Sequence, residues 1–204
     1  MNFAPVCDIS TDPSDFIYAR SFGQDAEQTS EYVKTVVKNM TGSGLGCVLK
    51  HFPGYGNNDD THTGSAIDKR PYDTFKTSDF LPFEAGINAG AGAVLVSHNV
   101  VECLDSSHPA SLSPEVHRIL RDELGFKGVI ITDDLDMDAI SDFTDSQTAA
   151  VLAAEAGNDI LCCTDFKDKY DAVLSAVNSG KFSRGIIDVA VTRILELKIS
   201  LGLT

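Results

Sequence analysis

The sequence has 204 residues, of which 16 are Lys or Arg and 30 are Asp or Glu, so its formal net charge is −14. This acidic balance argues against nucleic acid and against an anionic membrane surface as partners, because both attract basic patches. No apolar run reaches the ~18–20 residues of a transmembrane helix. With 43% hydrophobic and 23% charged residues, the composition is typical of a globular chain, and we treat residues 1–204 as a single domain.

Residues 1–8 have neither a basic n-region nor a long apolar stretch, so we do not interpret them as a secretory signal peptide. The five cysteines form no C-x-x-C pair, which is the spacing of zinc knuckles and thioredoxin-like motifs. Three of them lie inside apolar runs, where a free cysteine behaves as a small hydrophobic residue. We therefore expect reduced thiols, a cytoplasmic location, no metal and no other cofactor.

Short, nearly continuous apolar runs predict strands of a parallel sheet that is covered on both faces. They lie at residues 3–9, 45–49, 93–96, 129–131 and 160–162. Helical patterns separate these runs, and strands that alternate with helices indicate an α/β fold. Residues 52–71, rich in Gly, Asn and Asp, carry no helix or strand pattern and predict a long loop of the lid or binding type.

The predicted helices have recognisable starts and ends. In chain order the signals are a capping box at Asp25 and Gln28, a Ser113-Pro114 start with a stop at Gly125, a Thr144 and Gln147 box with a stop at Gly157, and an apolar stripe over 183–201.

Polar and ionisable residues follow four of the predicted strands. In parallel α/β folds ligands bind at the carboxyl ends of the strands, so these residues predict an active site on one rim. Each residue alone is better explained as a helix cap or as part of a solvated loop, and it is the four strand ends together that indicate an active site. The residues are Asp8 after the first run, Lys50 and His51 after the second, Ser97, His98 and Asn99 after the third, and Thr132, Asp133 and Asp134 after the fourth.

Asp133 is the best candidate for a nucleophile. It directly follows an apolar run and Thr132, and a carboxylate in that place can attack an electrophilic carbon and form a covalent intermediate. The alternative is that Asp133 caps the helix that begins near residues 136–140. The three further aspartates between 134 and 138 are better placed for that capping.

A second constellation is Asp60-Thr61-His62. In an extended loop residues two apart face the same way, so the Asp60 carboxylate can orient the His62 imidazole. Histidine titrates near neutral pH, which suits a general acid that later serves as base. An incidental Asp-x-His in a polar loop is the alternative. A metal site is disfavoured because no H-x-x-x-H or H-E-x-x-H spacing is present.

Several motifs together resemble glycoside hydrolase family 3, in its β-N-acetylhexosaminidase branch. KHFPGYG at 50–56 with Asp60-Thr61-His62 is similar to that branch's K-H-F-P-G-H-G…D-x-H signature. GVIITDDLDM at 128–137 looks like its nucleophile strand. FAPVCD at 3–8, RSFG at 20–23, PASLS at 109–113 and RILELK at 193–198 also fit.

The resemblance implies a (β/α) barrel of TIM type and a retaining glycosidase that removes terminal β-linked N-acetylglucosamine-type sugars. It implies that Asp133 is the nucleophile and that His62 is the acid/base with Asp60 as its orienting partner. Arg20, Lys50 and His51 match sugar-binding positions. The expected substrate is an amino-sugar glycoside or cell-wall fragment.

Three departures from the family pattern stand out. Tyr55 replaces the usual histidine, the loop before Asp60 is one residue shorter, and the family's barrel begins before the strand at 3–9. Five predicted strands instead of eight, and 204 residues where a barrel takes ~250, predict an incomplete barrel that is a fragment, a split product or a degenerate paralogue. We expect it to form a homo-oligomer or to pair with a missing N-terminal segment.

Two other functions stay open on the sequence. The chain could be an inactive or partner-dependent paralogue that acts as a carbohydrate-binding or scaffold protein. An unrelated, doubly wound binding domain would predict a G-x-G-x-x-G turn after the first strand, and the sequence has none there.

Overall fold

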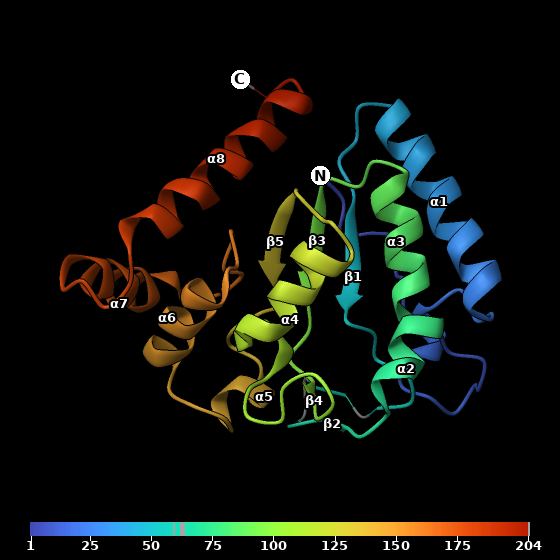
Figure 1. Ribbon diagram of the computed structural model, residues 1–204, viewed down its shortest axis with the longest axis horizontal. Helices are drawn as coiled ribbons and strands as arrows, with labels where there is room; N and C mark the ends of the chain where they lie inside the picture. The colour runs from blue at the N-terminus through green and yellow to red at the C-terminus, as the bar shows by residue number, and fades with distance from the viewer. Residues whose placement is uncertain (59, 62–63, 204) are drawn as a thin grey trace.

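The computed structural model describes residues 1–58, 60–61 and 64–203. Its centre is a parallel sheet of three strands, β1 (Val48–Phe52), β3 (Ala93–Val96) and β5 (Val129–Thr132), in the order β1-β3-β5 (Figure 1). β3 and β5 pair in continuous register, whereas the register between β1 and β3 shifts between Leu49 and Phe52. The predicted parallel sheet is confirmed, but the strand predicted at 45–49 lies at Val48–Phe52 and so includes Lys50 and His51.

Two further segments flank this sheet through isolated parallel bridges. Val6 bridges to Lys50 on one side, and Ile160 bridges to Ile131 on the other. The predictions of full strands at 3–9 and 160–162 were therefore wrong in extent. Pro5 has no N–H to donate to a ladder, and the backbone N–H of Cys162 donates to the side chain of Thr132 (2.9 Å) instead of to a backbone carbonyl.

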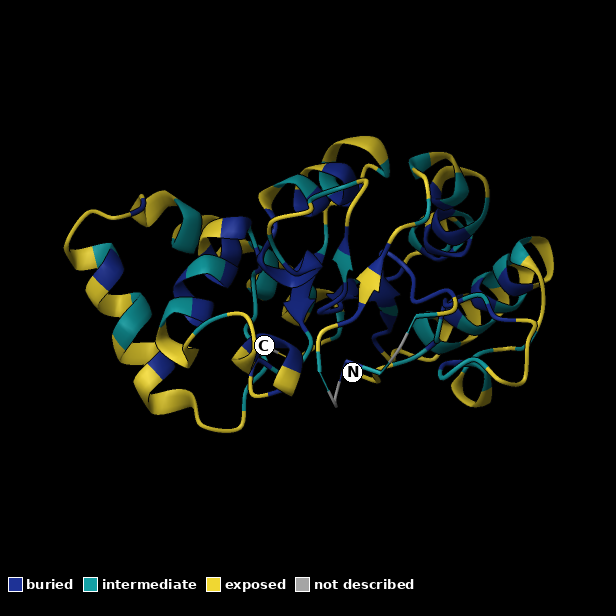
Figure 2. Ribbon diagram, turned by 90° about the horizontal axis from the view of Figure 1, so that it is seen from below, coloured by how far each residue is buried: buried dark blue, intermediate teal, exposed yellow. Residues whose placement is uncertain are grey.

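The five parallel segments lie side by side in chain order, and this order identifies the architecture. When each strand is added next to the previous one by right-handed crossovers, the connecting helices all fall on the same face. Helices α1 (Ala26–Gly42), α3 (Phe80–Asn88) and α4 (Pro114–Arg118) contribute to one core cluster against the sheet. Figure 2 shows the buried strands in the middle and the helices in an arc outside them. The α/β class is confirmed.

The two faces of the strands belong to different core clusters. Leu49, Val94 and Ile130 pack with the helices of the arc. The alternate residues of the same strands pack with Ile194 and Leu197 of α8 (Arg184–Ser200). Leu197 also lies against Gly92, just before β3, so α8 covers the amino ends of the strands at the top of Figure 1. The carboxyl ends point the other way.

The remaining elements lie in the connections. β2 (Ile67–Asp68) pairs in parallel with β4 (Val100–Val101), so the predicted loop at 52–71 contains a short strand. The helical elements are the 3₁₀ turns Tyr18–Arg20 and Ala110–Leu112, α2 (Tyr72–Thr74), the π-helical turns Phe75–Asp79 and Ile119–Glu123, α5 (Asp138–Ser141), α6 (Ser146–Ala156) and α7 (Phe166–Asn178).

Most of the predicted helix starts are confirmed by side-chain caps. Asp25 accepts from the N–H of Gln28 (2.9 Å), and the Ser113 side chain caps α4. The cap of α6 was predicted one residue too early. Asp145 caps this helix, because Thr144 still belongs to the preceding turn and its N–H donates to the carbonyl of residue 140. Among the described residues, no helix has both the length and the apolar character needed to cross a membrane.

Candidate active site

The carboxyl ends of the parallel segments gather the predicted rim residues. Asp8 follows the first segment, Lys50 and His51 lie within β1, and Asp133 follows β5 directly. Because the segments are parallel neighbours, these side chains come to one edge of the sheet, at the lower end of the strands in Figure 1. The sequence-based prediction of a common rim is confirmed.

Asp8 and His51 form a buried pair at this rim, with exposures of 1% and 2%. Asp8 Oδ2 accepts from the backbone N–H of His51 (3.1 Å) and lies 2.7 Å from His51 Nδ1. Arg20 Nη2 lies 3.0 Å from His51 Nε2. Since arginine can only donate, His51 Nε2 is the acceptor. The ring proton is therefore on Nδ1, which donates a hydrogen bond to Asp8. This pair fixes the imidazole tautomer and holds Arg20, whose side chain is exposed.

Lys50 lies half-buried among the charges of this rim. Burial lowers the pKa of its ammonium, the Arg20 guanidinium lowers this pKa further, and the carboxylates of Asp133 and Asp8 oppose both effects. Arg20, Asp133 and Asp8 are thus each close enough to Lys50 to act on its charge. Arg20 and Asp133 therefore both lie near Lys50, and their joint role in a site stays a prediction.

Asp133 is half-buried at the end of β5. Its N–H donates to the carbonyl of Val96 (2.9 Å), which fixes the backbone to β3, and its Oδ1 accepts from the N–H of Asp134 (3.0 Å). It does not cap the next helix, since α5 begins after Met137 without a side-chain cap. The structure gives Oδ2 of Asp133 no hydrogen-bond donor among the described residues. Within residues 1–58, 60–61 and 64–203, Asp133 therefore has no hydrogen bond that gives this oxygen a structural role.

The Asp60–His62 pair is only partly described. His62 lies outside the described residues, so its predicted interaction with Asp60 stays a prediction. Asp60 is half-buried, and its charge acts on the phenol of Tyr55. Burial, the largest effect, raises the pKa of Tyr55 well above its usual value, the hydrogen bond with Thr61 opposes this, and the carboxylates of Asp133, Asp8 and Asp60 add to it.

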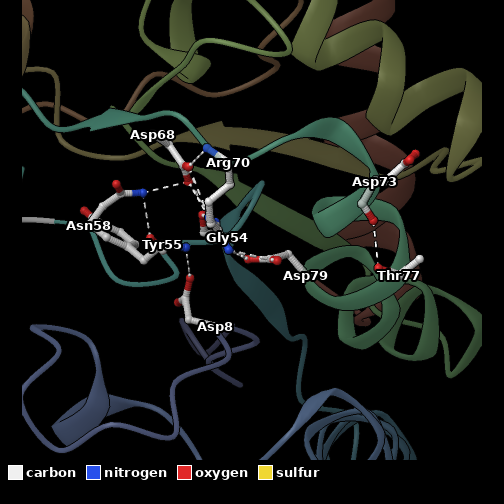
Figure 3. A network of polar contacts seen from close by, with 9 residues as sticks. All are labelled: Asp8, Gly54, Tyr55, Asn58, Asp68, Arg70, Asp73, Thr77 and Asp79. Atoms are coloured by element: carbon white, nitrogen blue, oxygen red, sulfur yellow. Dashed lines mark hydrogen bonds and ion pairs between the residues drawn. The ribbon is translucent and has the colours of Figure 1, made fainter.

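A buried charge cluster behind the rim was not predicted. Arg70 Nη1 donates to both oxygens of Asp79 (2.9 and 3.0 Å), and its Nη2 donates to Asp68 (2.7 Å) and to the carbonyl of Gly54 (3.3 Å), as Figure 3 shows. Gly54 has φ of +122°, and a Cβ there would lie 2.5 Å from Asp79 Oδ1. The cluster therefore holds the turn after β1 and requires glycine in it.

Two further contacts fix the loop after β5. His98, which follows β3, is bonded on both ring nitrogens: Nδ1 lies 2.7 Å from Ser111 Oγ, and Nε2 lies 2.9 Å from the carbonyl oxygen of Asp134. Lys169, only 4% exposed, donates to the carboxylate of Asp136. His98 was named as a site candidate from the sequence because it follows a predicted strand. No motif in the sequence indicated a role for Lys169.

Comparison with known proteins identifies the family. The sequence matches the Glycosyl hydrolase family 3 N terminal domain over residues 1–197. The chain belongs to this family. It is 41% identical over 141 residues to a Beta-hexosaminidase of Stenotrophomonas maltophilia, an alignment that covers 68% of this chain and 42% of that protein. A Beta-hexosaminidase of Nitrosomonas eutropha is 32% identical over 179 residues, which are 87% of this chain and 51% of that protein.

Solved structures give the same result. A glycoside hydrolase family 3 beta-N-acetylglucosaminidase from Paenibacillus sp. superposes with a TM-score of 0.94 at 35% identity, covering 99% of this chain and 40% of that one. A family 3 glycosyl hydrolase of Mycobacterium smegmatis gives a TM-score of 0.88 at 34% identity, covering 96% and 64%. This family 3 chain thus spans about half or less of the curated relatives described above.

Proposed function

We propose that this family 3 domain carries the catalytic site of a retaining glycoside hydrolase for terminal β-linked N-acetylglucosamine-type sugars. The observation that carries the proposal is the rim itself. Asp133 has one carboxylate oxygen to which no described residue donates a hydrogen bond. Its charge and that of Arg20 both act on the ammonium of Lys50. The names of the similar Beta-hexosaminidases support the choice of substrate class.

In the proposed mechanism Asp133 is the nucleophile. One carboxylate oxygen attacks the anomeric carbon, the bond from this carbon to the leaving oxygen breaks, and His62 gives that oxygen a proton. Water then attacks the glycosyl ester, His62 takes a proton from the water, and the Asp133 carboxylate is regenerated. Asp60 is the group that orients His62. Two successive displacements at one carbon retain its configuration.

Arg20 and Lys50 are the proposed contacts to sugar hydroxyls and to the amide carbonyl, since both are hydrogen-bond donors and neither is fully buried. The role of His51 is more specific than the sequence suggested. Its two ring nitrogens are engaged by Asp8 and Arg20, so in this state His51 serves the sugar site by holding the guanidinium in place.

A fluorinated, activated N-acetylglucosaminide tests the proposal, because it forms the glycosyl ester quickly and hydrolyses it slowly. Intact mass spectrometry of the wild-type chain should show the addition of one sugar, which peptide mapping places on Asp133. Asp133→Asn should give no adduct with an unchanged circular-dichroism spectrum, and the neighbouring Asp134→Asn should still be labelled. A label on Asp134 or Asp136 would refute the assignment. Sugar binding without any label would favour the carbohydrate-binding alternative.

A further inference from the structure

We propose that Tyr55 is a positioning residue, which holds Thr61, and with it the neighbouring Asp60, through a hydroxyl–hydroxyl bond to Thr61. The catalytic consequence rests on the proposed function, whereas the docking itself does not. Thr61 lies between Asp60 and His62 in the chain, so a contact that holds Thr61 also restricts the position of Asp60. Tyr55 is also the residue at which the KHFPGYG motif departs from the family pattern.

The contact is buried on both sides. Tyr55 and Thr61 are each 0% exposed, and the phenol oxygen of Tyr55 is hydrogen-bonded to Oγ1 of Thr61. The backbone of Thr61 is held as well, because its carbonyl accepts from the N–H of Ala139 in α5 (3.4 Å). Thr61 is therefore tied by its side chain to the turn after β1 and by its backbone to the helix that follows Asp133.

Tyr55 is itself held firmly enough to act as an anchor. Its N–H donates to Asp8 Oδ1 (2.8 Å), and its carbonyl accepts from the side-chain amide of Asn58 (2.8 Å), as Figure 3 shows. Its ring meets the His51 ring edge-on, with centroids 5.3 Å apart and an angle of 87° between the planes. The same Asp8 that fixes His51 thus also fixes the base of Tyr55.

These contacts form one continuous path across the rim, from Arg20 through His51, Asp8 and Tyr55 to Thr61. Removal of the phenol oxygen would leave the Thr61 hydroxyl buried without this partner. A buried hydroxyl without a partner is costly, so the segment gains by moving out into water. The hydroxyl of Tyr55 therefore sets how firmly Thr61 and Asp60 are held in place.

The first test is hydrogen–deuterium exchange on the full chain, which needs no substrate. In Tyr55→Phe, amides of residues 57–66 should exchange about tenfold faster, while amides of β3 keep their rates. Thr61→Val should give the same increase, and Thr61→Ser, which keeps the hydroxyl, should remain close to wild type. Tyr72→Phe is the control, because it also removes a phenol hydrogen bond, which Tyr72 makes to Glu123 (2.5 Å) at an exposed position.

The second test is kinetic. Tyr55→Phe should lower kcat about tenfold for glycosides with a poor leaving group, and much less for activated phenyl glycosides, with little change in KM. The double variant Tyr55→Phe/Thr61→Val should be no slower than either single variant, since each substitution removes the same hydrogen bond.

Unchanged exchange at 57–66 in Tyr55→Phe would overturn the docking. Faster exchange with equal rate losses for all leaving groups would support docking and remove its link to His62. Faster exchange in a chain that forms no sugar ester would support the docking while contradicting the proposed function.

Discussion

Asp8 and His51 are joined twice through a single oxygen. Asp8 Oδ2 accepts from both the backbone N–H and, at 2.7 Å, the Nδ1–H of His51, and the other carboxylate oxygen accepts from the N–H of Tyr55. One buried carboxylate therefore sets the end of β1, the imidazole tautomer and the turn that follows. This makes Asp8, which sequence analysis named only as a rim residue, the structural centre of the site.

Asp8→Asn should weaken both folding and sugar binding. An amide has one acceptor oxygen where the carboxylate has two, so at least one N–H that now donates to Asp8 loses its acceptor. We expect the free energy of unfolding to fall by about 1–3 kcal/mol and the affinity for N-acetylglucosamine to fall with it. Urea unfolding and titration calorimetry measure the two effects. Asp171→Asn, a change at an exposed carboxylate, is the control. If Asp8→Asn had the same free energy of unfolding and the same sugar affinity as this control, Asp8 would not be the structural centre of the site.

Asp79→Asn should change how stability depends on pH. Asp79 is 2% exposed, and burial raises its pKa to about 6 although Arg70 acts against the rise. A carboxyl whose pKa is raised in the folded state binds more protons than in the unfolded state between about pH 4 and pH 6, so its contribution to stability is lost as the pH rises through that range.

The size of this loss is at most about 3 kcal/mol, from the rise of the pKa from 3.8 to about 6. The difference in free energy of unfolding between wild type and Asp79→Asn should therefore shift in favour of the variant between pH 4.5 and pH 7.5. The amide keeps an acceptor for Arg70, so the cluster is not dismantled. A difference that is the same at both pH values would show that the Asp79 pKa is not raised.

The sheet was predictable from sequence because its strands are buried on both faces. A run such as 129–131 is apolar at every position, and this pattern changes little with tertiary context. The ends of the sheet were less predictable, since Pro5 cannot donate to a ladder and the Thr132 side chain replaces a backbone acceptor. Local chemistry of single residues decides such ends, and periodicity does not report it.

The site was predictable only where strand ends gather it. Asp133 and Lys50 follow from their positions after apolar runs. The Arg70 cluster and the bond between Tyr55 and Thr61 depend on side chains that meet only after the turn beyond β1 has formed. Lys169 illustrates the limit: nothing near it in the sequence distinguishes it from the exposed Lys167 two residues earlier.

Lys169→Met should loosen the loop that follows Asp133. Burial would raise the pKa of Asp136, but Lys169 and the backbone N–H groups of Thr164 and Asp165 outweigh burial and lower it. Loss of the ammonium should reduce the free energy of unfolding by about 1–3 kcal/mol and slow sugar-ester formation on Asp133. A lowered carboxyl pKa stabilises the fold at neutral pH, and this contribution is lost as the pH falls through the lowered value.

Lys167→Met is the control for this change, because it removes the same charge from the same helix at an exposed position. Unfolding curves at pH 7 and at pH 3.5 should show a difference between the two variants at pH 7 that shrinks in acid. If both variants unfold together at pH 7, the pair of Lys169 and Asp136 does not hold this loop.

His62→Ala should distinguish the acid/base from the nucleophile. A general acid matters most when the leaving oxygen is basic, because that oxygen needs a proton to depart. Turnover of N-acetylglucosaminides with alkyl or sugar leaving groups should fall by about 10²–10⁴-fold, and turnover of those with acidic phenols should fall far less. Asp60→Asn should produce a smaller loss in the same direction, since the imidazole keeps its place in the chain but loses its orienting charge.

Initial rates over a series of aryl and alkyl glycosides measure this effect as the slope of log kcat/KM against the leaving-group pKa. Wild type should give a shallow slope, and His62→Ala a steep one, because the departing oxygen must then carry its negative charge without a proton. Asp133→Asn should lie near the background for every leaving group, since no glycosyl ester forms without the attacking carboxylate, whichever group departs. Equal losses for phenolic and alkyl leaving groups in His62→Ala would make His62 a binding residue and leave the proton donor to another group at the rim.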